Sequence, residues 1–476
     1  MKFEEVQKHN SRSSCWVVIA GQAYDVTDFL NEHPGGPSSI LRLAGQDATE
    51  EYEPIHPAGT LDAHLPKEKH LGPVESPVAG SVAAGPPMPL VKEGEVPPLS
   101  TLQNVDEFEA AARQGLSKKA WVFYSSATDS LASLQQNRLD WTRIRLRPRV
   151  LRNVGRVSMR STFMGHDSDL PFFIAPAAQA RQGHPDGELC LARGAARHNI
   201  PYCTSTYSSV AHKELSACLA AEKKGGALTF QLYVPVAKPN ASFLIRDAIK
   251  LGFKALVLTV DSPVIGKREE DDRYKAELDH AAGINIPRSL STEDNAPIVR
   301  GAHSSTLEWD DLSWIREQWG NTGPVILKGI QTVEDAVMAA EAGIDGIYLS
   351  NHGGRQMDYA PSSISTLLEI RKYRPDLLKK MEFYLDGGVS RGSDVLKALA
   401  LGARAVGLGR PFLYALSAYG TDGVCKLIEL LNDEIQTTMR LLGVTDLSQL
   451  SDYYVNTTAL ENELPSRVDL RERSKL

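Results

Sequence analysis

The residues best suited to chemistry stand in one short stretch, Ser350-Asn351-His352-Gly353-Gly354-Arg355. The planar guanidinium of Arg355 matches the geometry of a carboxylate. His352, three positions earlier, can then act as a base on the carbon next to that carboxylate. Asp261 ends a separate apolar run and can stabilise the charged imidazole. The pattern predicts a site that holds an organic acid and removes a proton from it.

A second group of residues predicts a phosphorylated cofactor. Lys328 ends another apolar run, and a fixed cation there would stabilise a reduced, anionic flavin ring. Asp386-Gly387-Gly388 and Gly409-Arg410 follow the last two runs, where barrel proteins bind phosphate through backbone N–H groups and an arginine. Neither a Rossmann glycine motif nor a Walker lysine motif occurs, so a dinucleotide or ATP site is not supported.

Two histidines near the N-terminus predict a metal-bound group. His33 begins His-Pro-Gly-Gly, and His56 follows 23 residues later. Two axial imidazoles fill both free positions on a haem iron, which suits electron transfer because oxygen cannot then bind. With the preceding Tyr24-Asp25-Val26-Thr27, this segment resembles the cytochrome b5 family. The resemblance implies haem b, with His33 and His56 as its ligands.

The elements that must position these residues form a repeating pattern of strand and helix. Helical segments such as 332–342 and 393–401 lie between short apolar runs that qualify as buried parallel strands. The eight runs are residues 171–175, 200–204, 228–233, 255–260, 324–328, 346–350, 382–386 and 405–409. This alternation predicts an α/β fold, a closed (β/α)8 barrel of the TIM type. Such barrels catalyse at the carboxyl ends of their strands, which is where the polar residues collect.

The chain divides into four predicted parts. Residues 1–75 form a small α+β haem-binding domain, and 76–100 form a linker rich in Pro, Gly and Ala. Residues 101–465 form the barrel, and 466–476 form a C-terminal tail. The long polar stretch 267–305 follows a barrel strand, and we expect a mobile lid or protease-sensitive loop there.

Composition limits partners and location. The net charge of −7 gives no basic surface for nucleic acid, and no apolar run is long enough to span a membrane. Five irregularly spaced cysteines favour reduced thiols over a disulfide framework or a zinc site. The chain ends Ser474-Lys475-Leu476, a peroxisomal address. Cytoplasm and the mitochondrial intermembrane space are the alternatives.

Taken together, residues 101–460 resemble the FMN-dependent L-2-hydroxy-acid oxidase and dehydrogenase family. The resemblance implies that His352 is the base and Asp261 its partner. It implies that the substrate is held by Tyr233, Arg268 and Arg355, and that Phe123 also contacts it. It implies that FMN is surrounded by Pro176, Ala177, Ala178, Ser205, Gln231, Thr259, Lys328, Ser350, Asp386, Gly387, Gly388, Val389, Ser390, Gly409 and Arg410.

The sequence departs from the family at informative positions. Phe123 replaces a tyrosine whose phenol normally binds the substrate carboxylate, and losing such a bond costs about 1–3 kcal/mol. Ser390 replaces an arginine expected at the FMN phosphate, which leaves Arg410 to carry that charge. Tyr207 stands at the position that usually gates the substrate side chain, so the preferred acid is open. Lys119 is a candidate for contacting a haem propionate or the substrate carboxylate.

The expected reaction oxidises an L-2-hydroxy acid such as L-lactate to the keto acid and passes electrons through the haem to an acceptor. The acceptor is open between cytochrome c and oxygen, and a peroxisomal oxidase that produces hydrogen peroxide is the alternative enzyme. A non-catalytic scaffold with a decayed barrel is a further alternative. The family resemblance also implies a homotetramer. Hydride and carbanion mechanisms are both open at this point.

Overall fold

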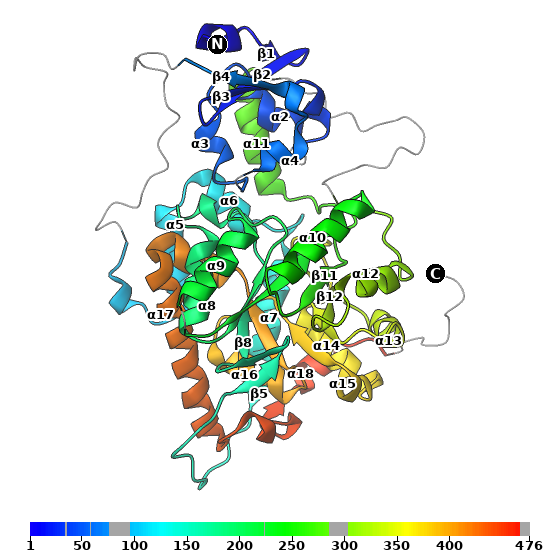
Figure 1. Cartoon of the computed structure of the whole chain (residues 1–476). Helices are drawn as coiled ribbons and strands as arrows, with labels where there is room; N and C mark the ends of the chain where they lie inside the picture. Colours follow the sequence, from blue (N-terminus) through cyan, green and yellow to red (C-terminus); the bar gives the residue numbers. More distant parts are fainter. Residues whose placement is uncertain (34–35, 58, 76–95, 223, 285–302, 467–476) are drawn as a thin grey trace.

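The computed structural model describes residues 1–33, 36–57, 59–75, 96–222, 224–284 and 303–466 (Figure 1). The predicted linker lies largely outside these ranges, and the C-terminal Ser-Lys-Leu lies wholly outside them. Within them, no helix has the length and apolar character needed to cross a membrane. The five cysteines are free thiols, as their irregular spacing predicts.

The N-terminal part is built on an antiparallel four-stranded sheet with the order β1-β2-β3-β4. The strands are β1 (Asn10–Ser11), β2 (Ser14–Ile19), β3 (Gln22–Asp25) and β4 (His70–Pro73). Ile19 lies opposite Gln22, so two residues make the turn. These residues, Ala20 and Gly21, have φ angles of 51° and 73°, as a tight hairpin turn requires.

Short helices pack on this sheet, and the two histidines lie in segments that follow two of them. They are α1 (Phe3–Gln7), η1 (Asp28–Asn31), α2 (Pro37–Leu41), α3 (Thr49–Tyr52), α4 (Thr60–His64) and η2 (Lys67–Lys69). His33 follows η1, and His56 follows α3. A small separate core that includes Cys15, Val17 and Leu30 holds the sheet and helices together.

The second part is a closed barrel of eight parallel strands, with the order β8-β9-β10-β11-β12-β13-β14-β15 returning to β8. The strands are β8 (Phe172–Ile174), β9 (Pro201–Thr204), β10 (Ala227–Leu232), β11 (Leu256–Thr259), β12 (Val325–Ile330), β13 (Gly346–Leu349), β14 (Glu382–Leu385) and β15 (Ala405–Leu408). All eight predicted strands are present, with their ends shifted by at most two residues. The predicted fold is confirmed.

Helices surround the barrel and precede it (Figure 1). Those before the first barrel strand are η3 (Leu99–Thr101), α5 (Val105–Gly115), α6 (Lys118–Ser125) and α7 (Ala132–Arg143). Those that follow are η4 (Ala180–Gln182), α8 (Glu188–Arg197), α9 (His212–Glu222), α10 (Lys238–Lys250), α11 (Glu269–Ala281), α12 (Asp311–Trp319), α13 (Val333–Glu341), α14 (Ser363–Tyr373), α15 (Leu377–Lys380), α16 (Gly392–Ala400), α17 (Arg410–Leu442), η5 (Leu447–Gln449), η6 (Asp452–Tyr454) and α18 (Thr458–Glu461). The minor strands are β5 (Arg145–Leu146), β6 (Ser161–Phe163), β7 (His166–Ser168) and β16 (Val455–Asn456).

The β6–β7 hairpin closes the amino end of the barrel. Phe163 and Met164 pack with Phe173, Tyr348 and Tyr384 in a buried cluster inside the strands. The Met164 backbone N–H donates to the Tyr384 hydroxyl at 3.1 Å. With this end filled by apolar side chains, ligands can enter only at the carboxyl ends of the strands.

The polar insertion after β11 is not the loop that we expected over its first part. Residues Glu269–Ala281 form helix α11, while 285–302 lie outside the described residues. Four acidic residues in the first turn suit the helix dipole, and Lys275 pairs with Asp271 one turn earlier at 2.7 Å. The helix was missed because it has no apolar stripe. It lies against the haem part (Figure 1), where Arg42 Nη1 meets Asp279 Oδ1 at 2.5 Å.

Candidate active site and haem site

His352 sits at the centre of the carboxyl end of the barrel, between an acid and a phenol. Its Nδ1 lies 2.9 Å and 3.0 Å from the two carboxylate oxygens of Asp261. Its Nε2 lies 3.1 Å from the hydroxyl of Tyr233. The carboxylate therefore fixes one ring nitrogen as a donor and leaves Nε2 as the acceptor that faces the cavity.

The loop that carries His352 is tightly constrained. His352 itself has a φ of 59°, and Gly353 and Gly354 follow with 64° and 75°. A left-handed conformation is uncommon for a residue with a side chain and often marks functional sites. Asn351 and Asn137 of α7 hold the loop through a reciprocal pair of amide hydrogen bonds, each 2.8 Å long. A Cβ on Gly354 would come within 2.7 Å of the Leu134 backbone nitrogen.

The electrostatic environment keeps the acid charged and the imidazole neutral. Burial lowers the pKa of His352, and the neighbouring Asp261 carboxylate opposes this shift. Burial alone would raise the pKa of Asp261, but His352 and Lys328 hold it below its ordinary value. A neutral imidazole beside a carboxylate can accept a proton at Nε2 and be stabilised once charged.

Three guanidinium groups gather beside this pair. Arg355 Nη1 donates to the carbonyls of Phe123 and Ser126, each at 2.9 Å. Burial, and repulsion from Arg268 and Arg410, lower the pKa of Arg355. The Nε of Arg268 is buried and has no hydrogen-bond partner among the described residues. Among the described residues none of the three forms a salt bridge with a carboxylate, the nearest acidic influence being that of residues such as Asp271. A bound carboxylate would supply a direct partner for these charges.

Lys328 lies at the centre of a buried polar chain. Its Nζ donates to Ser350 Oγ at 2.9 Å, and that hydroxyl donates to Asp386 Oδ1 at 2.7 Å. Gln231 Nε2 donates to Thr259 Oγ1 at 3.0 Å on the neighbouring strands. The contacts with Ser350 and Asp386 hold the lysine in one position beside the cavity. A fixed cation of this kind fits a flavin ring that becomes negatively charged on reduction.

The predicted phosphate loops make hydrogen bonds to other parts of the protein. Arg410 donates to the carbonyls of Tyr124, Gly353 and Ser126 at 2.9, 2.9 and 3.0 Å. The backbone N–H of Ser390 points to Asp394 Oδ2 at 3.3 Å. Arg410 therefore ties together the loops around Arg355, and its contact with a phosphate stays a prediction.

His33 and His56 face each other at a separation suited to one metal ion. Their ring centroids are 6.0 Å apart. Each Nδ1 contacts a backbone carbonyl, His33 that of Gly36 at 3.3 Å and His56 that of Tyr52 at 3.1 Å. Burial lowers the pKa of both histidines, that of His56 to about 4. Two neutral imidazoles sharing one metal through bonds of about 2 Å place their centroids roughly 6 Å apart, so these residues fit a haem iron.

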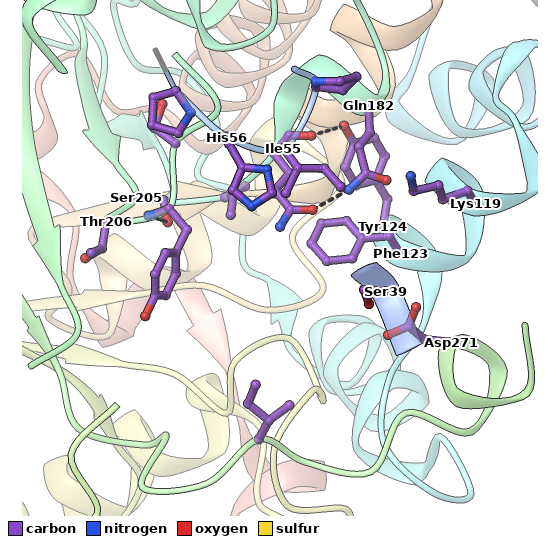
Figure 2. Close-up of a pocket in the computed structure, with 18 of the residues that line it drawn as sticks. Ser39, Ile55, His56, Lys119, Phe123, Tyr124, Gln182, Ser205, Thr206 and Asp271 are labelled. Atoms are coloured by element: carbon purple, nitrogen blue, oxygen red, sulfur yellow. Dashed lines mark hydrogen bonds between the residues drawn. The ribbon is translucent and has the colours of Figure 1, made fainter. Parts of the chain in front are cut away.

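One continuous cavity of about 3900 Å³ reaches from the haem ligands to the end of the barrel. Figure 2 shows His56 and Ile55 of the haem part facing the same space as Phe123 and Tyr124 of α6. Lys119 of α6 pairs across the two parts with Glu51. The hypothesis that Lys119 reaches toward the haem is consistent with this position.

The structure brings the predicted site residues together. Asp261 and Ser350 stand behind the cavity wall, where they contact His352 and Lys328. The predicted residues that line the cavity are His33, His56, Phe123, Pro176, Ala177, Ala178, Ser205, Gln231, Tyr233, Thr259, Arg268, Lys328, His352, Arg355, Asp386, Gly387, Gly388, Val389, Ser390, Gly409 and Arg410.

Sequence reasoning missed two residues of this region. Asn137 positions the catalytic loop from α7, and His303 lines the cavity beside Tyr233. Both belong to segments without a recognisable motif. The one available signal was that His303 lies in the insertion after a barrel strand, where active-site residues are common.

Comparisons with known families identify both parts. Residues 112–457 match the FMN-dependent dehydrogenase family, and residues 2–75 match the cytochrome b5-like haem/steroid binding domain. This chain belongs to the flavocytochrome b2 family. It is an FMN-dependent 2-hydroxy-acid oxidoreductase that carries a b5-type haem domain, and the expected FMN and haem cofactors are confirmed.

Relatives and solved structures share most of the chain. An L-lactate dehydrogenase (cytochrome) of Wickerhamomyces anomalus is 39% identical over 96% of this chain and 80% of its own length. A glycolate oxidase of Oryza sativa subsp. japonica is 37% identical over 78% of this chain and its whole length. The crystal structure of a flavocytochrome b2 variant with pyruvate bound has a TM-score of 0.70 at 35% identity, and covers 80% of this chain and 94% of that one.

Proposed function

We propose that the enzyme oxidises an L-2-hydroxy acid at His352 and passes the electrons to the haem held by His33 and His56. The observation that carries this proposal is the His352–Asp261 pair next to the unpartnered Nε of Arg268, in the cavity that also reaches His56. L-lactate is the first candidate substrate, since the cytochrome-type relatives at 39% and 37% identity are L-lactate dehydrogenases.

In the proposed mechanism, Arg355 and Arg268 bind the substrate carboxylate. This contact orients the 2-hydroxy carbon toward His352 Nε2, in the space beside the Tyr233 hydroxyl. Nε2 then accepts a proton from the substrate, and the Asp261 carboxylate stabilises the resulting imidazolium. The chemistry supplied by the bound groups is two-electron acceptance by FMN and one-electron transfer by the haem.

The proposal is tested by stopped-flow mixing of the holoenzyme with glycolate, L-lactate and L-mandelate while flavin and haem absorbance are recorded together. We expect flavin reduction followed by haem reduction with at least one of these acids. The oxidase alternative would be supported if the flavin is reduced and then reoxidised by oxygen while the haem stays oxidised. The match to glycolate oxidases gives that alternative its basis.

We further propose a peroxisomal location from Ser474-Lys475-Leu476, which lie outside the described residues. One relative, from Arabidopsis thaliana, is a peroxisomal (S)-2-hydroxyacid oxidase. Removing the three residues from a fluorescent fusion is expected to release it from peroxisomes. We also propose that the chain forms a homotetramer, which light scattering of the purified chain tests. The domain boundaries predicted from the sequence remain part of the proposal.

A further inference from the structure

The wall of the cavity beside Tyr233 holds an unexpected polar pair. The Tyr207 hydroxyl lies 3.0 Å from His303 Nδ1. The His303 ring stacks on Tyr233, with centroids 4.2 Å apart and planes inclined by 16°. Since Tyr233 in turn contacts His352 Nε2, the pair stands one aromatic ring away from the catalytic base.

The backbone fixes His303 in this place. His303 forms an antiparallel bridge with Pro235, just beyond the end of β10. The next residue, Ser304, donates its N–H to the Val234 carbonyl at 2.8 Å. His303 is thus attached to the segment that follows β10 and begins with Tyr233. Its ring lines the same cavity as His352 and Arg355.

Both members of the pair are uncharged near neutral pH. Burial lowers the pKa of His303 to about 4 and raises that of Tyr207 to about 12. A neutral imidazole and a phenol have two donors and several acceptors between them, and their mutual bond uses one donor and one acceptor. In either tautomer, the pair retains one donor and one acceptor for a ligand in the cavity.

We propose that Tyr207 and His303 form the pocket for the substrate side chain and select 2-hydroxy acids that carry a hydroxyl on the next carbon. Such a hydroxyl can satisfy both the donor and the acceptor of the pair. The methyl group of lactate satisfies neither, so lactate lacks a hydrogen bond to this partly exposed pair that a hydroxyl-bearing acid can make. This inference rests on the proposed oxidation of an L-2-hydroxy acid, and it places acids with a hydroxyl on the next carbon ahead of L-lactate, the first candidate by similarity.

The test compares L-glycerate with L-lactate, two acids that differ by one hydroxyl group. In the wild-type holoenzyme, we expect kcat/KM for flavin reduction to favour L-glycerate by roughly 2- to 10-fold, the net value of one hydrogen bond. His303→Leu and Tyr207→Phe should each bring that ratio to about 1, chiefly through KM for L-glycerate. The matched control is His280→Leu, an exposed histidine in the same insertion, which should leave the ratio unchanged.

A binding measurement separates recognition from chemistry. The dissociation constants of pyruvate and hydroxypyruvate, read from the flavin spectrum, should show the same loss of discrimination in both variants. A wild-type enzyme that prefers L-lactate, or variants that keep the wild-type ratio, would overturn the inference. If neither acid nor any member of the substrate panel reduces the flavin, the proposed function itself fails.

Discussion

The haem pocket and the barrel pocket both contain histidine, but the hydrogen-bond partners of the imidazole suit it to different chemistry in each. His33 and His56 have backbone carbonyls as Nδ1 partners, whereas His352 has the carboxylate of Asp261. A carbonyl orients a neutral ring for a metal without adding charge. A carboxylate stabilises the ring after it has taken a proton. All three histidines are buried enough to have a lowered pKa, so we propose that the Nδ1 partner, more than burial, distinguishes a ligand from a base.

The largest expected effect is the loss of the haem. His56→Ala removes one of two facing imidazoles, so we expect the spectrum of a haem with two histidine ligands to disappear. Flavin reduction by substrate should continue, because His352 and its partners lie in the barrel. Absorbance spectra and stopped-flow traces of the same preparation check both results. A variant that retains the wild-type haem spectrum would remove His56 from the ligand set.

The reciprocal change is His352→Gln, which keeps a polar side chain but removes the base. We expect the rate of flavin reduction to fall by about 10²–10⁴-fold, the usual contribution of a general base. The haem spectrum should be unchanged. If flavin reduction proceeds at the wild-type rate, His352 is not the base, and the contrast between the two pockets fails.

Asp261→Asn tests the role of the carboxylate through pH. His352 is active when neutral, so the rate should be full above its pKa and fall as the pH drops through it. Asp261 raises the pKa of His352, so the variant should lose activity at a lower pH than the wild type. Its plateau rate should fall about 10- to 100-fold, because a hydrogen bond to a charged group contributes about 1.5–3 kcal/mol. A pH profile displaced upward would contradict this assignment.

The smallest effect concerns the junction between the two parts. Lys119→Ala breaks the ion pair with Glu51 of the haem part. We expect haem reduction to slow by up to about 5-fold, since partly exposed ion pairs contribute about 1 kcal/mol or less. Flavin reduction should not change. Lys118→Ala is the matched control, because Lys118 pairs with Glu277 within the barrel part.

If Lys119→Ala and Lys118→Ala slow haem reduction equally, the Lys119–Glu51 pair has no specific role between the two pockets. Raising the salt concentration offers a second measurement. It should reduce the difference between the wild type and Lys119→Ala, because salt screens partly exposed charges.

The sequence by itself determined the barrel and most of its site. Eight apolar runs of strand length that alternate with helices, each ending in polar residues, predicted a closed parallel sheet whose carboxyl ends share one face. In such a sheet, His352, Arg355, Asp261 and Lys328 converge. The pairing of His33 with His56 could also be predicted from the sequence, because the His-Pro-Gly-Gly motif and the second histidine lie close together in one compact domain.

Only the tertiary structure decided the contacts between residues that lie far apart in the sequence. Helix α11 has charged residues on all sides, so no apolar periodicity predicted it or its contact with Arg42. Arg410 donates to three carbonyls, and these contacts depend on how the loops pack, while its binding of a phosphate stays a prediction. His303 reaches Tyr207 across 96 residues of chain. Such contacts follow from backbone paths in space, which local residue patterns do not encode.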